Sequence, residues 1–136
     1  MSSISTIALS GMKAAARRLD VSASNVANVM TTGALPAADG TVPSGAPLAY
    51  APLELVQTAS AGGGTQTSVA TAKPSTFASS DPQAPFANQN GLVAAPNVDL
   101  AHEMISQLVA KYSFAANATM MKANDRMTQT LLDIKV

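Results

Sequence analysis

His102 is the only histidine in the chain, and Asp99 lies one helical turn before it. Aspartate and histidine at this spacing could supply two ligands of a zinc site, but the sequence offers no third ligand nearby. Asp99 also suits the cap of a helix, in which Glu103 would lie near the positive end of the helix dipole. We therefore expect a capping or solvated role for these residues and no bound metal.

Phosphate binding and nucleophilic catalysis find equally little support. Gly62 to Gly64 could line a phosphate site, yet no Lys-Ser or Lys-Thr pair follows and no helix is predicted to start there. Serine and threonine are plentiful, but no G-x-S-x-G motif is present for His102 to serve. Glu54 and Asp81 lie in a weakly charged segment with nothing around them to indicate an acid–base pair. The sequence predicts no enzyme, no catalytic residue and no cofactor.

The composition narrows the function classes further. The chain has 136 residues, the length of one domain, and its 47% hydrophobic content includes no Trp, two Tyr and three Phe. Eight basic and eight acidic residues balance, which argues against a partner nucleic acid. Cysteine is absent, and no run of 18 apolar residues could insert into a membrane. The N-terminus lacks the pattern of a secretory signal, so we expect any export to occur without a cleaved signal peptide.

All eight prolines fall within Pro36 to Pro96, which leaves two proline-free ends able to form long helices. In the first, apolar residues recur on one face from Ser3 to Met30, and Gly33 predicts the end of the helix. In the second, an apolar face with a mean step near 3.6 residues predicts a helix from Asp99 to Ile134. The residues predicted to pack are Met12, Leu19, Val26 and Met30 in the first helix and Ile105, Leu108, Tyr112, Ala116, Met120, Met127 and Leu131 in the second.

The segment from 34 to 96 is rich in Gly, Pro, Ala and Thr and low in charge. Leu53 to Thr58 and Thr65 to Ala72 have strand-like composition, and the glycine-rich stretch between them predicts a small β-hairpin at about 50–72. Phe77 to Asn90 contains two prolines and predicts an extended connector. We therefore divide the chain into an N-terminal helix (1–33), this middle segment (34–96) and a C-terminal helix (97–136).

The apolar faces of the two helices need something to cover them. Paired as an antiparallel hairpin, with Met12, Leu19 and Val26 facing the stripe from Ile105 to Met127, they would bury one seam. Further apolar residues such as Phe114 fall outside that seam and would stay exposed. Apolar surface on more than one side of the helices predicts packing against other subunits.

Each end of the chain also carries a distinctive asparagine-containing sequence. The first runs from Leu19 to Asn28 and is followed by Thr31-Thr32-Gly33, and the second includes Pro96 to Leu100, Glu103-Met104 and Phe114 to Asn117. In this order and position, the two resemble the paired terminal signatures of bacterial flagellar rod and hook proteins. The signature residues are Asn25, Ala27, Asn28, Thr31, Gly33, Asn97, Val98, Asp99, Glu103, Met104, Phe114 and Asn117.

The resemblance implies a mainly α fold in which the terminal helices pair as an antiparallel coiled-coil-like domain. It implies that the chain is a structural subunit of the periplasmic flagellar rod. It also implies that the subunit is exported through the flagellar type III export apparatus. Copies of the chain and other rod proteins would assemble helically into a hollow drive shaft that transmits torque. Short length and the Pro96 to Asp99 sequence favour the proximal rod and a protein of the FlgC type.

Two other interpretations fit the same residues. A small secreted helical binding protein, or an export chaperone, would fold as a monomer or dimer and bind one partner through its exposed apolar stripe. A distal-rod-like subunit is the other alternative, because the turns from Met127 to Ile134 resemble those of distal rod proteins.

Overall fold

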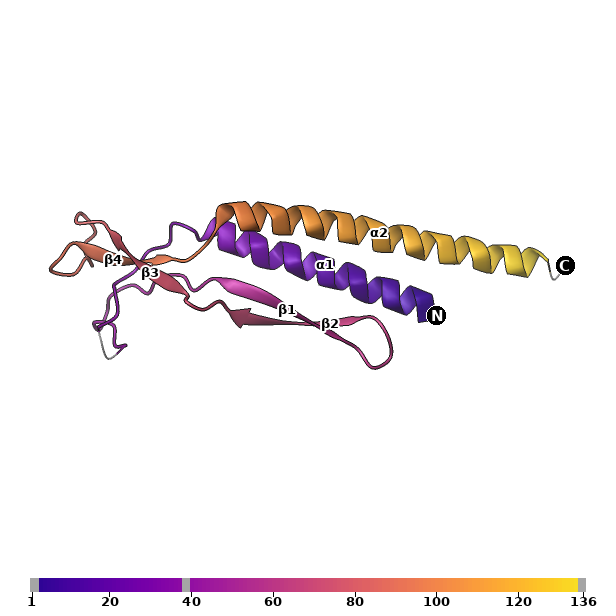
Figure 1. The fold of residues 1–136 in the computed structure, drawn as a ribbon, viewed down its shortest axis with the longest axis horizontal. Coiled ribbons are helices and arrows are strands. Elements are labelled where there is room, and N and C mark those ends of the chain that lie inside the picture. Colours follow the sequence, from indigo (N-terminus) through magenta and orange to yellow (C-terminus); the bar gives the residue numbers. More distant parts are fainter. Residues whose placement is uncertain (1–2, 38–39, 135–136) are drawn as a thin grey trace. The chain divides into compact units, whose positions relative to one another are not determined.

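The computed structural model describes residues 3–37 and 40–134, which form two helices and four strands (Figure 1). The helices are α1 (Ser3–Ala27) and α2 (Leu100–Asp133). Between them come β1 (Leu53–Ala59), β2 (Thr65–Thr71), β3 (Thr76–Ser80) and β4 (Leu92–Pro96), paired as two antiparallel sheets, β1–β2 and β3–β4. Within the described ranges, neither helix combines the length and the apolar character needed to cross a membrane.

The fold class predicted from the sequence is wrong. We expected a mainly α, coiled-coil-like domain with one small hairpin, whereas the described residues contain a second sheet, β3–β4. The β1–β2 pair lies where the hairpin was expected, but β3 covers the start of the stretch from 77 to 90 that was predicted to be a connector. Its partner β4 lies beyond both prolines of that stretch, so the local composition could not reveal the pairing.

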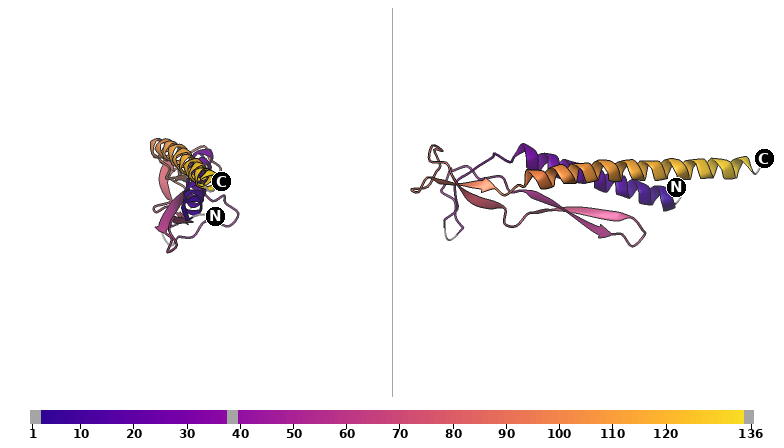
Figure 2. Two further views of the ribbon diagram at one scale, coloured as in Figure 1. Left: turned by 90° about the vertical axis from the view of Figure 1, so that its right-hand side faces the viewer. Right: turned by 45° about the horizontal axis from the view of Figure 1, so that its top comes forward.

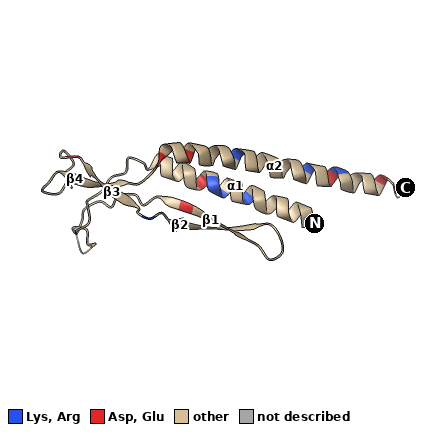
Figure 3. Cartoon of the chain, in the orientation of Figure 1, with Lys and Arg blue, Asp and Glu red and all other residues tan. Residues whose placement is uncertain are grey.

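Residues 3–22, 55–69 and 104–134 form one compact unit, called here the helical unit, in which α1 and α2 lie side by side (Figures 1 and 2). The Nε2 of Gln107 donates a hydrogen bond to the Oγ of Ser22 at 3.2 Å. The Nδ2 of Asn124 donates to the Oγ of Ser5 at 2.9 Å. The partner that lies further along α2 lies nearer the start of α1, so the two helices are antiparallel. Charged residues are scattered along both helices (Figure 3).

Small side chains build the seam between the two helices. Ala14 and Ala15 of α1 and Ala110 of α2 are all buried. At Gly11 the approach is so close that an added Cβ atom would lie 2.4 Å from the Oδ1 of Asn117. Side chains this small let the two helix axes approach more closely than large side chains would. The seam is therefore narrow and buries little apolar area.

The β1–β2 hairpin is attached to α1 within the helical unit. The backbone N–H of Thr65 donates to the Oγ of Ser10 at 3.1 Å, and the guanidinium of Arg18 donates to the Oε1 of Gln57. Gly64 has a φ of +84°, and a Cβ atom at this position would lie 2.3 Å from the Oγ of Ser10. The loop that the sequence marked as a glycine-rich turn therefore needs glycine both for its backbone angle and for its contact with the helix.

Residues 23–54 and 70–103, apart from the two undescribed positions 38 and 39, form the second compact unit, called here the sheet unit. Its β3–β4 sheet runs from Thr76 opposite Pro96 to Ser80 opposite Leu92. Val93, the second residue of β4, is only 1% exposed, although β4 belongs to a sheet of just two strands. Other segments of the sheet unit, loops among them, must therefore cover β4.

Gly33 ties one of these loops to β4. Its backbone N–H donates to the carbonyl oxygen of Ala94 at 3.0 Å, and the N–H of Ala94 donates back to the carbonyl oxygen of Gly33 at 2.9 Å. An added Cβ atom at Gly33 would lie 2.1 Å from the backbone nitrogen of Ala49, which also belongs to the sheet unit. Three backbone segments therefore meet at a point where no side chain fits.

Candidate assembly surface

The helix seam is formed by other residues than the apolar spacing predicted. Leu19 is 47% exposed, and Ile105 and Tyr112 of the predicted stripe are 60% and 68% exposed. Met12 and Val26 are only half-buried. The physical reason is size, because the alanine and glycine positions permit a closer helix approach than rows of Leu and Met would. The predicted seam is thus replaced by a narrower one.

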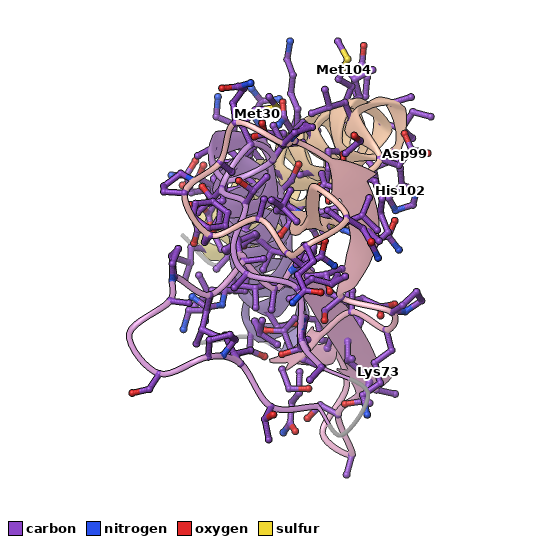
Figure 4. The ribbon with its side chains drawn as sticks, turned by 90° about the vertical axis from the view of Figure 1, so that its left-hand side faces the viewer. Met30, Lys73, Asp99, His102 and Met104 are labelled. Atoms are coloured by element: carbon purple, nitrogen blue, oxygen red, sulfur yellow. The ribbon has the colours of Figure 1, made fainter. Side chains whose placement is uncertain are left out.

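The large apolar residues of α2 instead face outward. Exposed side chains on this helix include all seven residues that were predicted to pack, and we call this set the outer stripe: Ile105, Leu108, Tyr112, Ala116, Met120, Met127 and Leu131. Met30, the last of the predicted packing residues in the N-terminal segment, is also exposed (Figure 4). Several large apolar side chains exposed along one helix are typical of a surface that contacts another protein.

A second apolar surface runs along one flank of the helix pair. Two adjoining open hollows, of about 450 and 330 Å³, lie between α1 and α2 and share Leu19 and Lys111. Met104, Leu108 and Phe114 of α2 supply most of the remaining large side chains. We call these five residues the flank groove. The groove offers apolar walls and one cationic amine.

Asn25, a signature residue near the end of α1, makes four hydrogen bonds within the sheet unit. It is 2% exposed, and its Nδ2 donates to the carbonyl oxygen of Leu53 at 2.9 Å and to the Oε1 of Glu103 at 2.6 Å. Its Oδ1 accepts from the hydroxyl of Tyr50 at 3.0 Å and from the backbone N–H of Leu53 at 2.9 Å. One amide thereby joins the end of α1, the start of β1 and the first turn of α2.

The remaining signature residues of the sheet unit mostly shape the ends of elements. Asp99 caps α2, since its Oδ1 accepts from the backbone N–H groups of Ala101 and His102 at 2.9 and 3.2 Å. The Nδ2 of Asn97 donates to the carbonyl oxygen of Pro74 at 3.1 Å, and Asn28 bonds the last turn of α1. Of the other signature residues of the chain, Val98 and Asn117 are half-buried, and Ala27, Thr31, Met104 and Phe114 are exposed.

Sequence reasoning missed the small and polar residues that form the seam. A signal was present in their spacing, since Ala8, Ala15 and Ser22 recur every seven residues in α1. Glu103, Ala110, Asn117 and Asn124 do the same in α2, and all four lie on the buried or half-buried side of the helix. A search restricted to large apolar residues could not register this period.

The metal ligands considered from the sequence do not gather into a site in the described residues. No group of three or more His, Cys, Asp or Glu side chains in the described ranges is placed to hold a metal ion. Asp99 and His102, the pair considered as ligands, lie at the surface of the sheet unit, where Asp99 serves as the helix cap (Figure 4).

Two protein families match the chain, one at each end. The family described as "Flagella basal body rod protein" matches residues 6–34, and the one described as "Flagellar basal body rod FlgEFG protein C-terminal" matches residues 89–134. No curated protein sequence matches the chain. Proteins of these families are structural components of the flagellar basal body and not enzymes. The matched ranges contain nearly all of α1 and all of α2, the two helices that meet through small residues and expose their large ones. The chain therefore belongs to the flagellar basal-body rod and hook family.

Proposed function

We propose that the chain is a subunit of the proximal flagellar rod, in which the outer stripe of α2 is buried against other copies and other rod proteins. The observation that carries this proposal is the exposure of the large apolar residues along α2. Each such side chain stabilises an interface by about 1.5–3 kcal/mol when it becomes fully buried. The narrow seam leaves these apolar side chains exposed in the single chain. Their burial can therefore stabilise contacts between chains.

Repeated head-to-tail contacts between such subunits produce an open helical array, because a heterologous interface that does not close continues to add copies. A tube of this kind, walled by long helices, would transmit torque, and its bore would let later subunits pass. We further propose that the chain reaches this site through the flagellar export apparatus without cleavage of a signal peptide.

The proximal position is supported by the short middle segment between the two signatures. A distal-rod-like position is the alternative, and it is favoured by one observation. The family that matches residues 89–134 carries the names FlgEFG in its description, which does not include the FlgC type. Imaging basal bodies in which this chain carries a label distinguishes the two positions by the distance of the label from the base of the rod.

Substitution Tyr112→Asp tests the proposal that the outer stripe is an assembly surface. The aspartate is harmless on the exposed helix of a single chain but places an unpaired charge in a buried interface, which costs several kcal/mol in every subunit. We expect cells with this variant to be non-motile and their basal bodies to lack the chain. Gln129→Asp, also exposed on α2 but outside the outer stripe, is the matched control and should leave motility intact. Normal swimming by the Tyr112→Asp strain would contradict the proposal.

A further inference from the structure

α2 is longer than the helix that it pairs with. Toward the C-terminal end of α2, Asn124 is joined by a hydrogen bond to Ser5, at the start of α1. Every residue from Asp125 to Ile134 is exposed, and we call this segment the α2 overhang. Its ten residues extend for about 15 Å. Figures 1 and 2 show α2 continuing past the beginning of α1.

The overhang is apolar on one face and acidic at its tip. Met127, Leu131 and Ile134 are spaced four and three residues apart, which places them on the same side of the helix, and all three are exposed. Asp133 is the last residue of α2, and the last turn contains no basic residue. A carboxylate at the negative end of a helix dipole is unfavourable unless a cation lies near it. The next residue, Lys135, lies outside the described part of the chain.

The flank groove has the features that would complement this tip. Its α2 residues run from Met104 to Phe114, a length of about 15 Å that equals that of the overhang. Leu19 and Leu108 provide apolar walls, and Lys111 provides the cation that the last turn of α2 lacks. Length, apolar character and charge therefore agree between two surfaces that lie at different positions along the same helix.

We propose that the α2 overhang of one copy docks in the flank groove of a second copy, with the two α2 helices parallel and Asp133 beside Lys111. This inference rests on the proposed function and names the partner and the contact. The parallel direction follows from the extent of the groove. With Asp133 level with Lys111, parallel helices bring Met127 level with Ile105, beside Met104, so that the overhang lies over the groove. An antiparallel arrangement would bring Met127 level with Asn117, beyond the end of the groove at Phe114. Since overhang and groove are different surfaces, each added copy leaves a free groove and a free overhang.

A disulfide between Met104→Cys and Met127→Cys tests the contact directly. The two positions are roughly 35 Å apart on one helix, and a disulfide needs Cα atoms about 4.4–6.8 Å apart, so this bond can form only between copies. The natural chain has no cysteine, so no competing thiol is present. In oxidised basal bodies, and in the concentrated full-length chain, we expect a ladder of dimers, trimers and longer species. Met104→Cys with Gln129→Cys is the matched control, because Gln129 lies off the apolar face of the overhang.

A charge exchange tests the direction of docking. Lys111→Asp or Asp133→Lys alone should slow formation of the Met104–Met127 disulfide roughly fivefold, as expected for the reversal of one exposed ion pair. The two reversals together should restore the rate, because the pair is re-formed with opposite sign. Restoration is a readout that a general loss of folding could not produce.

Three results would overturn the inference: no product above the Gln129 control, a product that stops at the dimer, or a disulfide to a different rod protein. Failure of the inference and failure of the proposed function are separable. A chain that is present in basal bodies but does not form the Met104–Met127 bond leaves its role as a rod subunit intact. A chain that is missing from basal bodies refutes that role itself.

Discussion

The two faces of α2 differ in both size and chemistry. The face toward α1 carries Ala110, Asn117 and Asn124, which are small or polar and are buried or half-buried. The outer stripe lies outside this seam, with Leu108 at its edge in the flank groove, and its members are mostly large, apolar and exposed. In a protein that is complete as a monomer the distribution is the reverse, with large apolar residues inside. In α2, the residues of the inner face determine how closely the two helices pack, and those of the outer stripe leave apolar surface exposed.

This division of labour separates the determinants of folding from those of assembly. A substitution on the inner face disturbs close packing or a buried hydrogen bond, and therefore acts on the single chain. A substitution on the outer stripe changes little until a neighbour arrives. The following predictions test that separation.

Asn25→Ala should have the largest effect on the single chain. The Leu53 backbone and the Glu103 carboxylate would each lose a buried partner, so we expect the free energy of unfolding to fall by about 3–4 kcal/mol. Urea unfolding of the purified chain, followed by circular dichroism, measures this loss. Asn90→Ala, at an exposed asparagine of the same unit, is the control and should lie within about 0.5 kcal/mol of the wild type. Equal effects of the two substitutions would remove the special role of Asn25.

Ala110→Leu and Ala116→Leu compare the two faces of α2 with one and the same substitution. Ala110 is 2% exposed in the seam, so the added carbons must separate the helices, at a cost of about 1–3 kcal/mol. Ala116 belongs to the exposed outer stripe, where leucine should change the stability of the single chain by less than about 0.5 kcal/mol. The same urea experiment provides both values. If Ala116→Leu were the more damaging variant, the assignment of inner and outer faces would be reversed.

Ser5→Ala and Asn124→Ala probe the polar part of the inner face. Their hydrogen bond spans 2.9 Å in a buried setting, and we expect a coupling free energy of about 1 kcal/mol in the double-mutant cycle. Strictly additive effects would show that the bond contributes nothing to the pairing of the helices.

His102→Ala should have the smallest effect of all. The exposed imidazole is not part of the cap, which uses the backbone N–H of this residue and therefore survives the change. Stability should stay within about 0.5 kcal/mol of the wild type, and swimming-plate diameters should be unchanged. A rod that assembles but does not work in this strain would reveal a role for the ring that packing does not explain.

The sequence predicted the two helices well because proline and glycine positions act locally. α1 was expected from Ser3 to Met30 and ends at Ala27, and α2 was expected from Asp99 to Ile134 and spans Leu100 to Asp133. The family signature was equally accessible, because it depends on residue identity and order. It did not reveal what its members do in the structure, since the partners of Asn25 lie 25 to 78 positions away in the chain.

Two features could not be obtained from local sequence. Helical spacing shows that Ile105 and Tyr112 share a face, but it does not show whether that face points toward the other helix, and in the single chain both residues are exposed. The β3–β4 pair was missed because the burial of Val93 depends on covering loops and on the backbone contact with Gly33. Both errors concern tertiary partners, which single-residue propensities do not encode.

The contacts along the helix seam also have a mechanical meaning. The hydrogen bonds of Ser22 and Ser5 and the close approach of Gly11 to Asn117 lie at three levels of α1, spread over roughly 25 Å of the helix axis. A force that slides one helix along the other loads all three levels together, in shear, and must break them at once. A force that peels the helices apart from one end loads them in turn. The helix pair therefore resists a force directed along the helix axis more strongly than a force that peels the helices apart from one end.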